Sequence, residues 1–164
     1  MLSVVNREVQ LLNCHPARTT FVLSVHQPIV NRASILLIDD EAALRQLFAA
    51  VLTQQGYRCH EANNGLAGLA HLSTNQPDLV LLDINMPALD GFAVLTGIRQ
   101  QDPAVGVIMC SAQSATHFAA KALNAGADGY LTKPVRLPLL LQEIERVNEL
   151  VQLRRHQPLP LLKL

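Results

Sequence analysis

The sequence predicts a doubly wound α/β domain, in which five parallel strands alternate with five helices between residues 34 and 153. Short apolar runs such as Leu79-Val80-Leu81-Leu82 recur along this region, and runs of this length are typical of strands buried on both faces. Stretches with apolar residues at helical spacing separate them. Hydrophobic residues make up 49% of the chain and charged residues only 16%, below the roughly 25% of an average soluble domain, which fits a sheet covered on both sides.

Five strands are predicted from the apolar runs. They span residues 34–39, 57–61, 78–83, 105–110 and 127–131. The organised pattern begins with the first of them at Ser34, and the second is short. Strands that alternate with helices in this way are expected to pair in parallel.

Five helices are predicted between and after these strands. The first opens at Glu41 and is closed by Gly56, which follows its last apolar positions as a C-cap glycine does. The others span about 64–73, 92–101, 114–124 and 137–153. The buried face of the last helix is expected to consist of Leu140, Ile144, Val147 and Val151.

The two ends of the chain do not follow this pattern. Residues 1–33 contain brief apolar patches interrupted by Pro16 and Pro28, and we expect a mostly disordered extension there. A true start near Val30 would account for it, a hypothesis that intact-mass analysis of the natural protein would test. Residues 154–164 are expected to form a C-terminal tail.

Composition argues against several classes of function. The formal net charge is zero, so no overall basic field favours nucleic acid or a membrane surface. No apolar stretch approaches the roughly 18 residues of a membrane span, and a cytoplasmic protein is expected. Cys14, Cys59 and Cys110 are widely spaced, without a CxxC pair or a Cys/His cluster at metal-ligand spacing.

Polar residues follow four of the predicted strands. Asp39 and Asp40 end the first, Asp83 ends the third, Ser111 follows the fourth and Lys133 follows the fifth. The carboxyl ends of parallel strands lie at one edge of a sheet, where binding sites of such folds form. We therefore expect these five residues to meet in one site.

The chemistry of this set points to a divalent cation and a phosphoryl group. Two carboxylates 4 Å apart repel by about 4 kcal/mol at an effective dielectric of 20, so the three acids require protonation or a cation. With oxygen ligands alone, Mg²⁺ or Mn²⁺ fits and Zn²⁺ does not. An ammonium from Lys133 and a hydroxyl from Ser111 complete a phosphoryl-transfer site, in which aspartate can act as the nucleophile.

Between about residues 34 and 153 the chain resembles the receiver domain of two-component response regulators. The resemblance rests on Leu37-Ile38-Asp39-Asp40-Glu41, Leu82-Asp83-Ile84-Asn85-Met86-Pro87, Asp90-Gly91, Cys110-Ser111-Ala112 and Ala125-Gly126-Ala127-Asp128-Gly129-Tyr130-Leu131-Thr132-Lys133-Pro134. Each motif is weak alone, but their order and spacing together are specific. The resemblance implies a flavodoxin-like sheet of strand order 2-1-3-4-5, an order that is a known property of this fold.

The resemblance also implies roles for individual residues. Asp83 matches the phosphoacceptor, and Lys133 matches the lysine that pairs with the phosphoryl group, followed by a peptide bond to Pro134 that is commonly cis. The Mg²⁺ or Mn²⁺ ligands would be Asp40, Asp39 through a bound water, Asp83 itself and the backbone carbonyl of Asn85. Ser111 and Tyr130 match the switch hydroxyl and the rotating aromatic. Asp90 and Gly91 are expected to shape the loop and cap the next helix, without a chemical role.

A signalling switch is the function that the resemblance implies, rather than an enzyme acting on a separate substrate. A sensor histidine kinase or phosphotransfer protein would donate the phosphoryl group. The face formed by the fourth helix, fifth strand and fifth helix, including Lys121, Asp128 and Arg146, would then bind a partner or a second copy of the chain. Eleven residues after Leu153 are too few for a DNA-binding output module, so the chain is expected to act through protein contacts or as part of a longer regulator or hybrid kinase.

Two other classes of function would need different motifs. A phosphatase of the haloacid-dehalogenase kind would need a DxD motif after the first strand, where this chain has Asp39-Asp40-Glu41. An FMN carrier would need a Ser/Thr/Gly-rich phosphate loop at the same place, and three acids there would repel the phosphate. Phosphate release from small phosphoesters would favour the first alternative, and a yellow protein the second.

Overall fold

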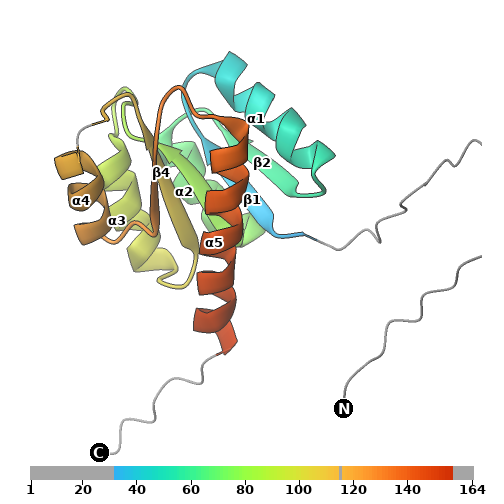
Figure 1. Ribbon diagram of the computed structural model, residues 1–164. Coiled ribbons are helices and arrows are strands. Elements are labelled where there is room, and N and C mark those ends of the chain that lie inside the picture. The colour runs from blue at the N-terminus through green and yellow to red at the C-terminus, as the bar shows by residue number, and fades with distance from the viewer. Residues whose placement is uncertain (1–31, 115, 157–164) are drawn as a thin grey trace, which may run out of the picture.

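The computed structural model describes residues 32–114 and 116–156 and contains one five-stranded parallel sheet (Figure 1). The predicted extension 1–33 and tail 154–164 lie largely outside the described residues. The strands are β1 (Ser34–Ile38), β2 (Arg58–Ala62), β3 (Leu79–Asp83), β4 (Gly106–Ser111) and β5 (Gly129–Thr132). The helices are α1 (Ala42–Gln54), α2 (Gly65–Asn75), α3 (Gly91–Gln101), α4 (Thr116–Asn124) and α5 (Leu137–His156). The strand order β2-β1-β3-β4-β5 confirms the expected topology.

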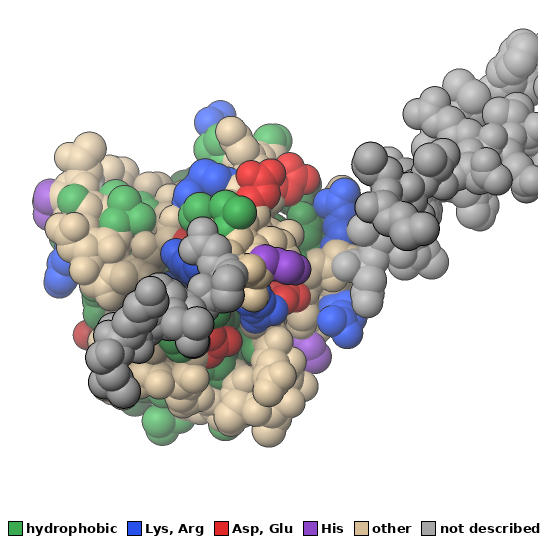
Figure 2. All heavy atoms as spheres, turned by 90° about the horizontal axis from the view of Figure 1, so that it is seen from below, with side chains coloured by type: hydrophobic (Ala, Val, Ile, Leu, Met, Phe, Trp, Pro, Cys, Tyr) green, Lys and Arg blue, Asp and Glu red, His purple; other side chains and the backbone are tan. Residues whose placement is uncertain are grey.

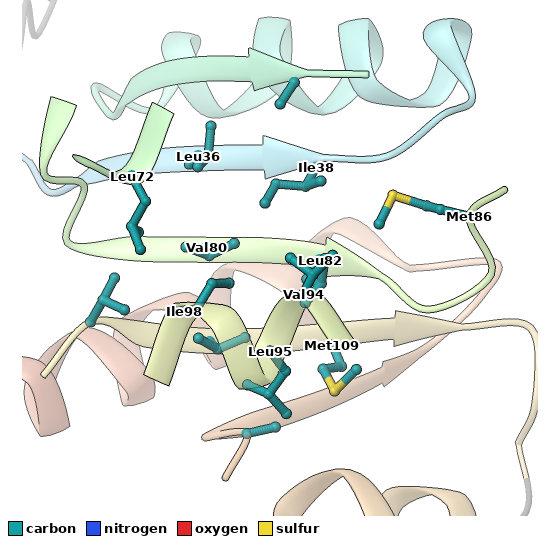
Figure 3. Packing of buried hydrophobic residues seen from close by; sticks show 14 of the residues in the cluster. Leu36, Ile38, Leu72, Val80, Leu82, Met86, Val94, Leu95, Ile98 and Met109 are labelled. Atoms are coloured by element: carbon teal, nitrogen blue, oxygen red, sulfur yellow. The ribbon is translucent and has the colours of Figure 1, made fainter. Parts of the chain in front are cut away.

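Helices cover both faces of the sheet, because successive side chains of a strand point to opposite sides. In β1, Leu36 and Ile38 contribute to the core under α2, α3 and α4, while Ile35 and Leu37 face the core under α1 and α5. Figure 3 shows the first of these cores, with Val94, Leu95 and Ile98 of α3 over the strands. All residues of β1, β3 and β4 are buried, which explains why their sequences are continuous apolar runs.

The parallel register brings the ends of the strands together at what we call the carboxyl edge of the sheet. Ile38 pairs with Leu82, and Asp83 pairs with Cys110. The pairing of Ser111 with Thr132 places the residues after β5 at the same level. The predicted site residues therefore come from neighbouring positions of one edge.

Helix α5 lies close against β4 at the opposite, amino edge. A Cβ atom added to Gly106 would lie 2.6 Å from Val147 Cγ1 and 2.9 Å from Val151 Cγ2, so only glycine allows this approach. The helix continues to His156, three residues beyond its predicted end. Arg154 and Arg155 in that additional stretch form ion pairs with aspartates at the starts of β5 and β3. No helix in the described part of the chain is long and apolar enough to cross a lipid bilayer.

Candidate functional site

Three aspartates meet at the carboxyl edge of the sheet. Asp39 and Asp40 follow β1, and Asp83 is the last residue of β3, the strand beside it. One carboxylate oxygen from each lies within 4.8 Å of the others. Asp39 and Asp83 are buried, with 7% and 5% of their surfaces exposed, whereas Asp40 is exposed. The predicted convergence of these three residues is confirmed.

Lys133 reaches this cluster from the loop after β5. Its Nζ lies 2.9 Å from Asp39 Oδ2 and 3.0 Å from Asp83 Oδ1. Burial alone would lower the pKa of Lys133, but the hydrogen bonds and attraction from the two carboxylates outweigh burial and leave its pKa above the ordinary value. The lysine is therefore held in its charged form, and the Lys133–Pro134 peptide bond after it is cis, as the resemblance implied.

The charges at this edge are not balanced. Lys133 supplies one positive charge to three carboxylates, and its Nζ, 3.0 Å away, is the only donor near the buried Asp83 Oδ1 among the described residues. Three clustered carboxylates with one ammonium between them are costly unless a cation or protonation reduces the negative charge. Because every acidic side chain here offers a hard oxygen, Asp39, Asp40 and Asp83 fit a hydrated Mg²⁺ or Mn²⁺ ion.

The loop after β3 packs directly on Asp83. The Gly91 N–H donates to the Ile84 carbonyl at 2.9 Å, and a Cβ atom at Gly91 would lie only 2.5 Å from the Asp83 carbonyl oxygen. Asp90 caps α3 by accepting from the Ala93 N–H at 2.8 Å, as the sequence predicted. Gly91 therefore shapes the site. The sequence predicted a loop role for Asp90-Gly91 but not the close approach of Gly91 to the Asp83 backbone.

Ser111 and Tyr130 converge on a third residue, Gln113, in the loop between β4 and α4. The Ser111 hydroxyl is buried and accepts a hydrogen bond from the Gln113 N–H at 3.1 Å. The Tyr130 hydroxyl donates to the Gln113 carbonyl at 2.6 Å. The two predicted switch residues are thus connected through one loop residue, and neither forms a hydrogen bond with the acidic cluster within the described structure.

The residues expected on the face of α4, β5 and α5 lie in different environments. Lys121 Nζ lies 4.5 Å from the ring centre of Phe92 in α3. The Asp128 side chain is only 5% exposed and forms ion pairs with Arg99 and Arg154. Asp128 is therefore not an exposed interface residue, a correction to the prediction, because its carboxylate points into the amino edge of the sheet. Arg146 is exposed and donates to the Asp128 carbonyl.

One contributor near the site was missed from the sequence. Arg45 in α1 donates from Nη1 to the Asp39 carbonyl at 2.7 Å and from Nε to Glu61 Oε2 at 3.1 Å. A signal was present, because Arg45 lies three and seven positions before Phe48 and Leu52, the two buried residues of that helix. A charge on the apolar stripe of a helix needs a buried partner.

Comparison with known proteins agrees with this geometry. Residues 35–145 match the family model of the response regulator receiver domain. The chain belongs to this family. Receiver domains are the response regulator part of two-component signalling systems, and the motifs that suggested the resemblance lie inside the matched residues.

Relatives of the receiver domain include whole proteins and parts of larger ones. The chain is 35% identical to the chemotaxis protein CheY of Halobacterium salinarum over 113 residues, which cover 69% of this chain and 94% of the relative. It is 34% identical to the regulatory protein AtoC of Escherichia coli over 126 residues, covering 77% of this chain but 27% of AtoC. The match to the sensor histidine kinase RcsC of the same organism is 37% over 121 residues, covering 74% of this chain and 13% of RcsC.

Solved structures show the same fold. NtrX from Brucella abortus in complex with ATP superposes with a TM-score of 0.71 at 34% identity, covering 75% of this chain and 28% of NtrX. The receiver domain of the Francisella response regulator 1452 gives a TM-score of 0.67 at 32% identity, covering 75% of this chain and 99% of that domain.

Proposed function

We propose that this receiver domain accepts a phosphoryl group on Asp83 from a sensor histidine kinase or a phosphotransfer protein, in a reaction that requires Mg²⁺ or Mn²⁺. The observation that carries the proposal is the state of Asp83. Its carboxylate is buried, close to two other acids, and paired at 3.0 Å with Lys133, which also pairs with Asp39 and so leaves the cluster with more negative than positive charge.

The chemical step uses the Asp83 carboxylate as the nucleophile. One of its oxygens attacks the phosphorus of a phosphohistidine, the P–N bond breaks as the P–O bond forms, and the electron pair leaves with the imidazole of the donor. Asp39, Asp40, Asp83 and the Asn85 backbone carbonyl would hold the cation. When bound, the cation offsets the negative charge of the transferred group.

Lys133 and Ser111 act on the phosphorylated state. In the unphosphorylated protein Lys133 is shared between Asp39 and Asp83, and a phosphoryl group on Asp83 would offer it three further acceptor oxygens. Ser111 would exchange its bond to Gln113 for one to the phosphoryl group. Because Tyr130 also bonds to Gln113, this exchange reaches the β5 surface, and the face of α4, β5 and α5 would change its affinity for a partner or a second copy.

The test is the substitution Asp83→Asn, which keeps the shape of the side chain and removes the nucleophile. With acetyl phosphate or a phosphorylated histidine kinase as donor and Mg²⁺ present, the wild type is expected to form an acid-stable, base-labile adduct seen on Phos-tag gels. Asp83→Asn is expected to form none. Asp90→Asn is the matched control, because Asn also caps a helix and the substitution removes one exposed carboxylate seven residues away. Label retained by Asp83→Asn would overturn the assignment.

The conformational part of the proposal has its own test. Lys133→Ala is expected to permit some phosphorylation but to uncouple it from partner binding, because the lysine acts on the phosphoryl oxygens of the product. Beryllofluoride with Mg²⁺, a mimic of the phosphoryl group, is expected to shift NMR signals of Tyr130, Lys121 and Arg146 in the wild type. Shifts confined to the surroundings of Asp83 would identify a phosphate relay rather than a switch.

A further inference from the structure

Arg45 is an almost buried charge beside the acidic cluster, and the proposed phosphoryl transfer does not assign it a role. Its side chain is only 11% exposed although it belongs to a surface helix. Together with Asp39, Asp83 and Cys110 it lines a cavity of about 10 Å³ beneath the carboxyl edge. A side chain with so little exposed surface cannot contribute much to a docking interface, so we look for its role in contacts within the domain.

The guanidinium group links the backbone after β1 to a side chain of β2. Nη1 donates to the Asp39 carbonyl at 2.7 Å, and Nε donates to Glu61 of β2 at 3.1 Å. The ladder contact between the Asp39 N–H and the Ala62 carbonyl is longer, at 3.3 Å. The planar guanidinium holds both partners in a fixed geometry, which an ammonium would not do.

The bonded carbonyl belongs to the peptide unit between Asp39 and Asp40. Because a peptide unit is planar, holding its oxygen restrains the whole unit, and with it ψ of Asp39 and φ of Asp40, the dihedrals that set the direction of the two neighbouring Cα–Cβ bonds. The side chain of Asp39 is already held by the Glu41 N–H at 2.8 Å and by Lys133 at 2.9 Å. Asp40 is exposed, and no hydrogen bond of its carboxylate is present in the described structure, so the orientation of this peptide unit is what directs it toward Asp83.

We propose that Arg45 is a positioning residue for the divalent-cation site, which holds the Asp39–Asp40 peptide unit so that both carboxylates converge on Asp83. Glu61 supports the guanidinium from the other side. The inference rests on the proposed cation-dependent function of the same site. It assigns to Arg45 a contribution to cation affinity that acts through the backbone, without contact to the cation.

Charge and positioning predict opposite results for the loss of Arg45. Removing a positive charge near three carboxylates makes the local electrostatic potential more negative, and this change alone would tighten the binding of a cation. Loss of positioning weakens it, and substitutions of groups that orient metal ligands typically reduce metal affinity by about 10-fold to 100-fold. The sign of the change in dissociation constant therefore separates the two effects.

The experiment measures the Mn²⁺ dissociation constant of the full chain by EPR of the free ion, with Mg²⁺ competition. Arg45→Met is expected to bind Mn²⁺ about tenfold more weakly than wild type. Its phosphorylation by acetyl phosphate is expected to be slow at low Mg²⁺ and to recover at saturating Mg²⁺. Arg45→Lys keeps the charge and one donor, and is expected to show a smaller loss. The matched control is Arg58→Met on β2, which removes the same charge from an exposed side chain and is expected to leave the constant unchanged or slightly tighter.

The outcomes are distinguishable. Unchanged or tighter Mn²⁺ binding by folded Arg45→Met would overturn the positioning role, as would an equal loss in Arg58→Met. If Arg45→Met does not fold, Arg45→Lys decides, because wild-type affinity in that variant would also overturn the role. A wild-type chain that binds no Mn²⁺ would instead refute the proposed cation-dependent function and the role of Arg45 with it.

Discussion

Aspartates stand at both edges of the sheet, but the two edges balance their charges differently. At the amino edge, Asp128 precedes β5 and forms ion pairs with Arg99 at 2.8 Å and with Arg154, while Asp78 precedes β3 and pairs with Arg155. At the carboxyl edge, three aspartates lie together and Lys133 pairs with two of them, Asp39 and Asp83. Figure 2 views the molecule from below, on the side of the amino edge, and shows basic and acidic side chains close together there.

Hydrogen bonding follows the same division. Asp128 Oδ2 also accepts from the Val107 N–H at 2.9 Å, and Asp78 Oδ2 accepts from the Ser34 N–H at 2.8 Å, so each carboxylate caps the first residues of a neighbouring strand. Burial would raise the pKa of Asp128, but bonds from Arg154 and Val107 and the charge of Arg99 lower it below the ordinary value. The acids of the amino edge are paired with arginines and stabilise the fold, whereas the carboxyl edge has more acidic than basic side chains.

Substitution at the two edges should therefore have opposite effects on stability. Asp128→Asn removes the charge that compensates Arg99 and Arg154, and the loss of one partner of a largely buried ion pair costs about 3 kcal/mol. Asp83→Asn removes a charge from an edge with too many, and is expected to leave the metal-free stability equal to or above that of the wild type. Urea unfolding at neutral pH without metal measures both. Equal losses in the two variants would contradict the division between the edges.

Acid should abolish the difference between wild type and Asp128→Asn. The pKa of Asp128 is lowered in the folded state, so its stabilisation is present above the unfolded value of about 3.9 and is lost as pH falls through the folded pKa. Unfolding curves of the two proteins at a series of pH values are expected to approach each other below about pH 4. A constant difference down to the lowest pH would show that the carboxylate charge is not what stabilises this edge.

Close packing, rather than charge, is the feature of the carboxyl edge that Gly91→Ala would test. The added methyl group would meet the Asp83 carbonyl oxygen at 2.5 Å and Ile84 Cα at 2.7 Å, and overpacking against backbone costs about 2 kcal/mol. The same shift should weaken Mg²⁺ binding, because it moves the backbone of Asp83. Gly97→Ala in the same helix is the control, since its methyl group would meet only the movable end of Leu69, and it is expected to be nearly neutral.

The alternation of apolar runs and helical periods was sufficient to predict the fold, because every strand and helix lies near its expected position. The largest error is the end of α5, expected at 153 and found at His156. Helical spacing of apolar residues marks Val151 as the last core position. The additional turn depends on ion pairs from Arg154 and Arg155 to aspartates before β5 and β3, which no local pattern reveals.

The candidate site was predicted to the extent that sheet topology determines it. Asp39, Asp83 and Lys133 follow strands whose order and direction bring them together, so their convergence needed no knowledge of side-chain conformation. The specific contacts of Arg45 and Gly91 were not predicted, because they depend on how one side chain reaches a carbonyl and how closely two backbones approach. Helical spacing places Arg45 on the apolar stripe of its helix, but it does not identify the Asp39 carbonyl as its partner.

A smaller effect is expected at the exposed member of the acidic cluster. Asp40→Ala relieves repulsion in the metal-free protein, but Asp40 is solvent-exposed, so the gain in free energy of unfolding should be less than about 1 kcal/mol. The same variant is expected to lose most of its stabilisation by Mg²⁺. Thermal unfolding with and without Mg²⁺ measures both quantities. A metal-free melting temperature below that of the wild type would contradict the excess of negative charge at this edge.

The smallest effect concerns backbone strain, which also occurs at both edges. Ala88, in the loop after Asp83, has φ of 70°, and Gln76, at the end of α2, has φ of 44°. A residue with a Cβ lowers the free energy of unfolding by about 1 kcal/mol when it adopts this conformation. Glycine avoids this strain, but its larger conformational entropy in the unfolded chain cancels part of the stabilisation. Ala88→Gly and Gln76→Gly are each expected to raise the free energy of unfolding by about 0.5 kcal/mol.

Only one of these two glycine variants should also affect the site. Ala88 lies in the segment between Asp83 and Gly91 that carries the Asn85 carbonyl, whereas Gln76 lies at the amino edge. A more flexible loop should hold that carbonyl less firmly, so Ala88→Gly is expected to bind Mg²⁺ slightly more weakly and Gln76→Gly to bind it as the wild type does. That result would indicate that the strained conformation of Ala88 helps to hold the Asn85 carbonyl in place, since backbone strain is often found near functional residues. Equal Mg²⁺ affinities in both variants would assign the strain at Ala88 to the fold alone.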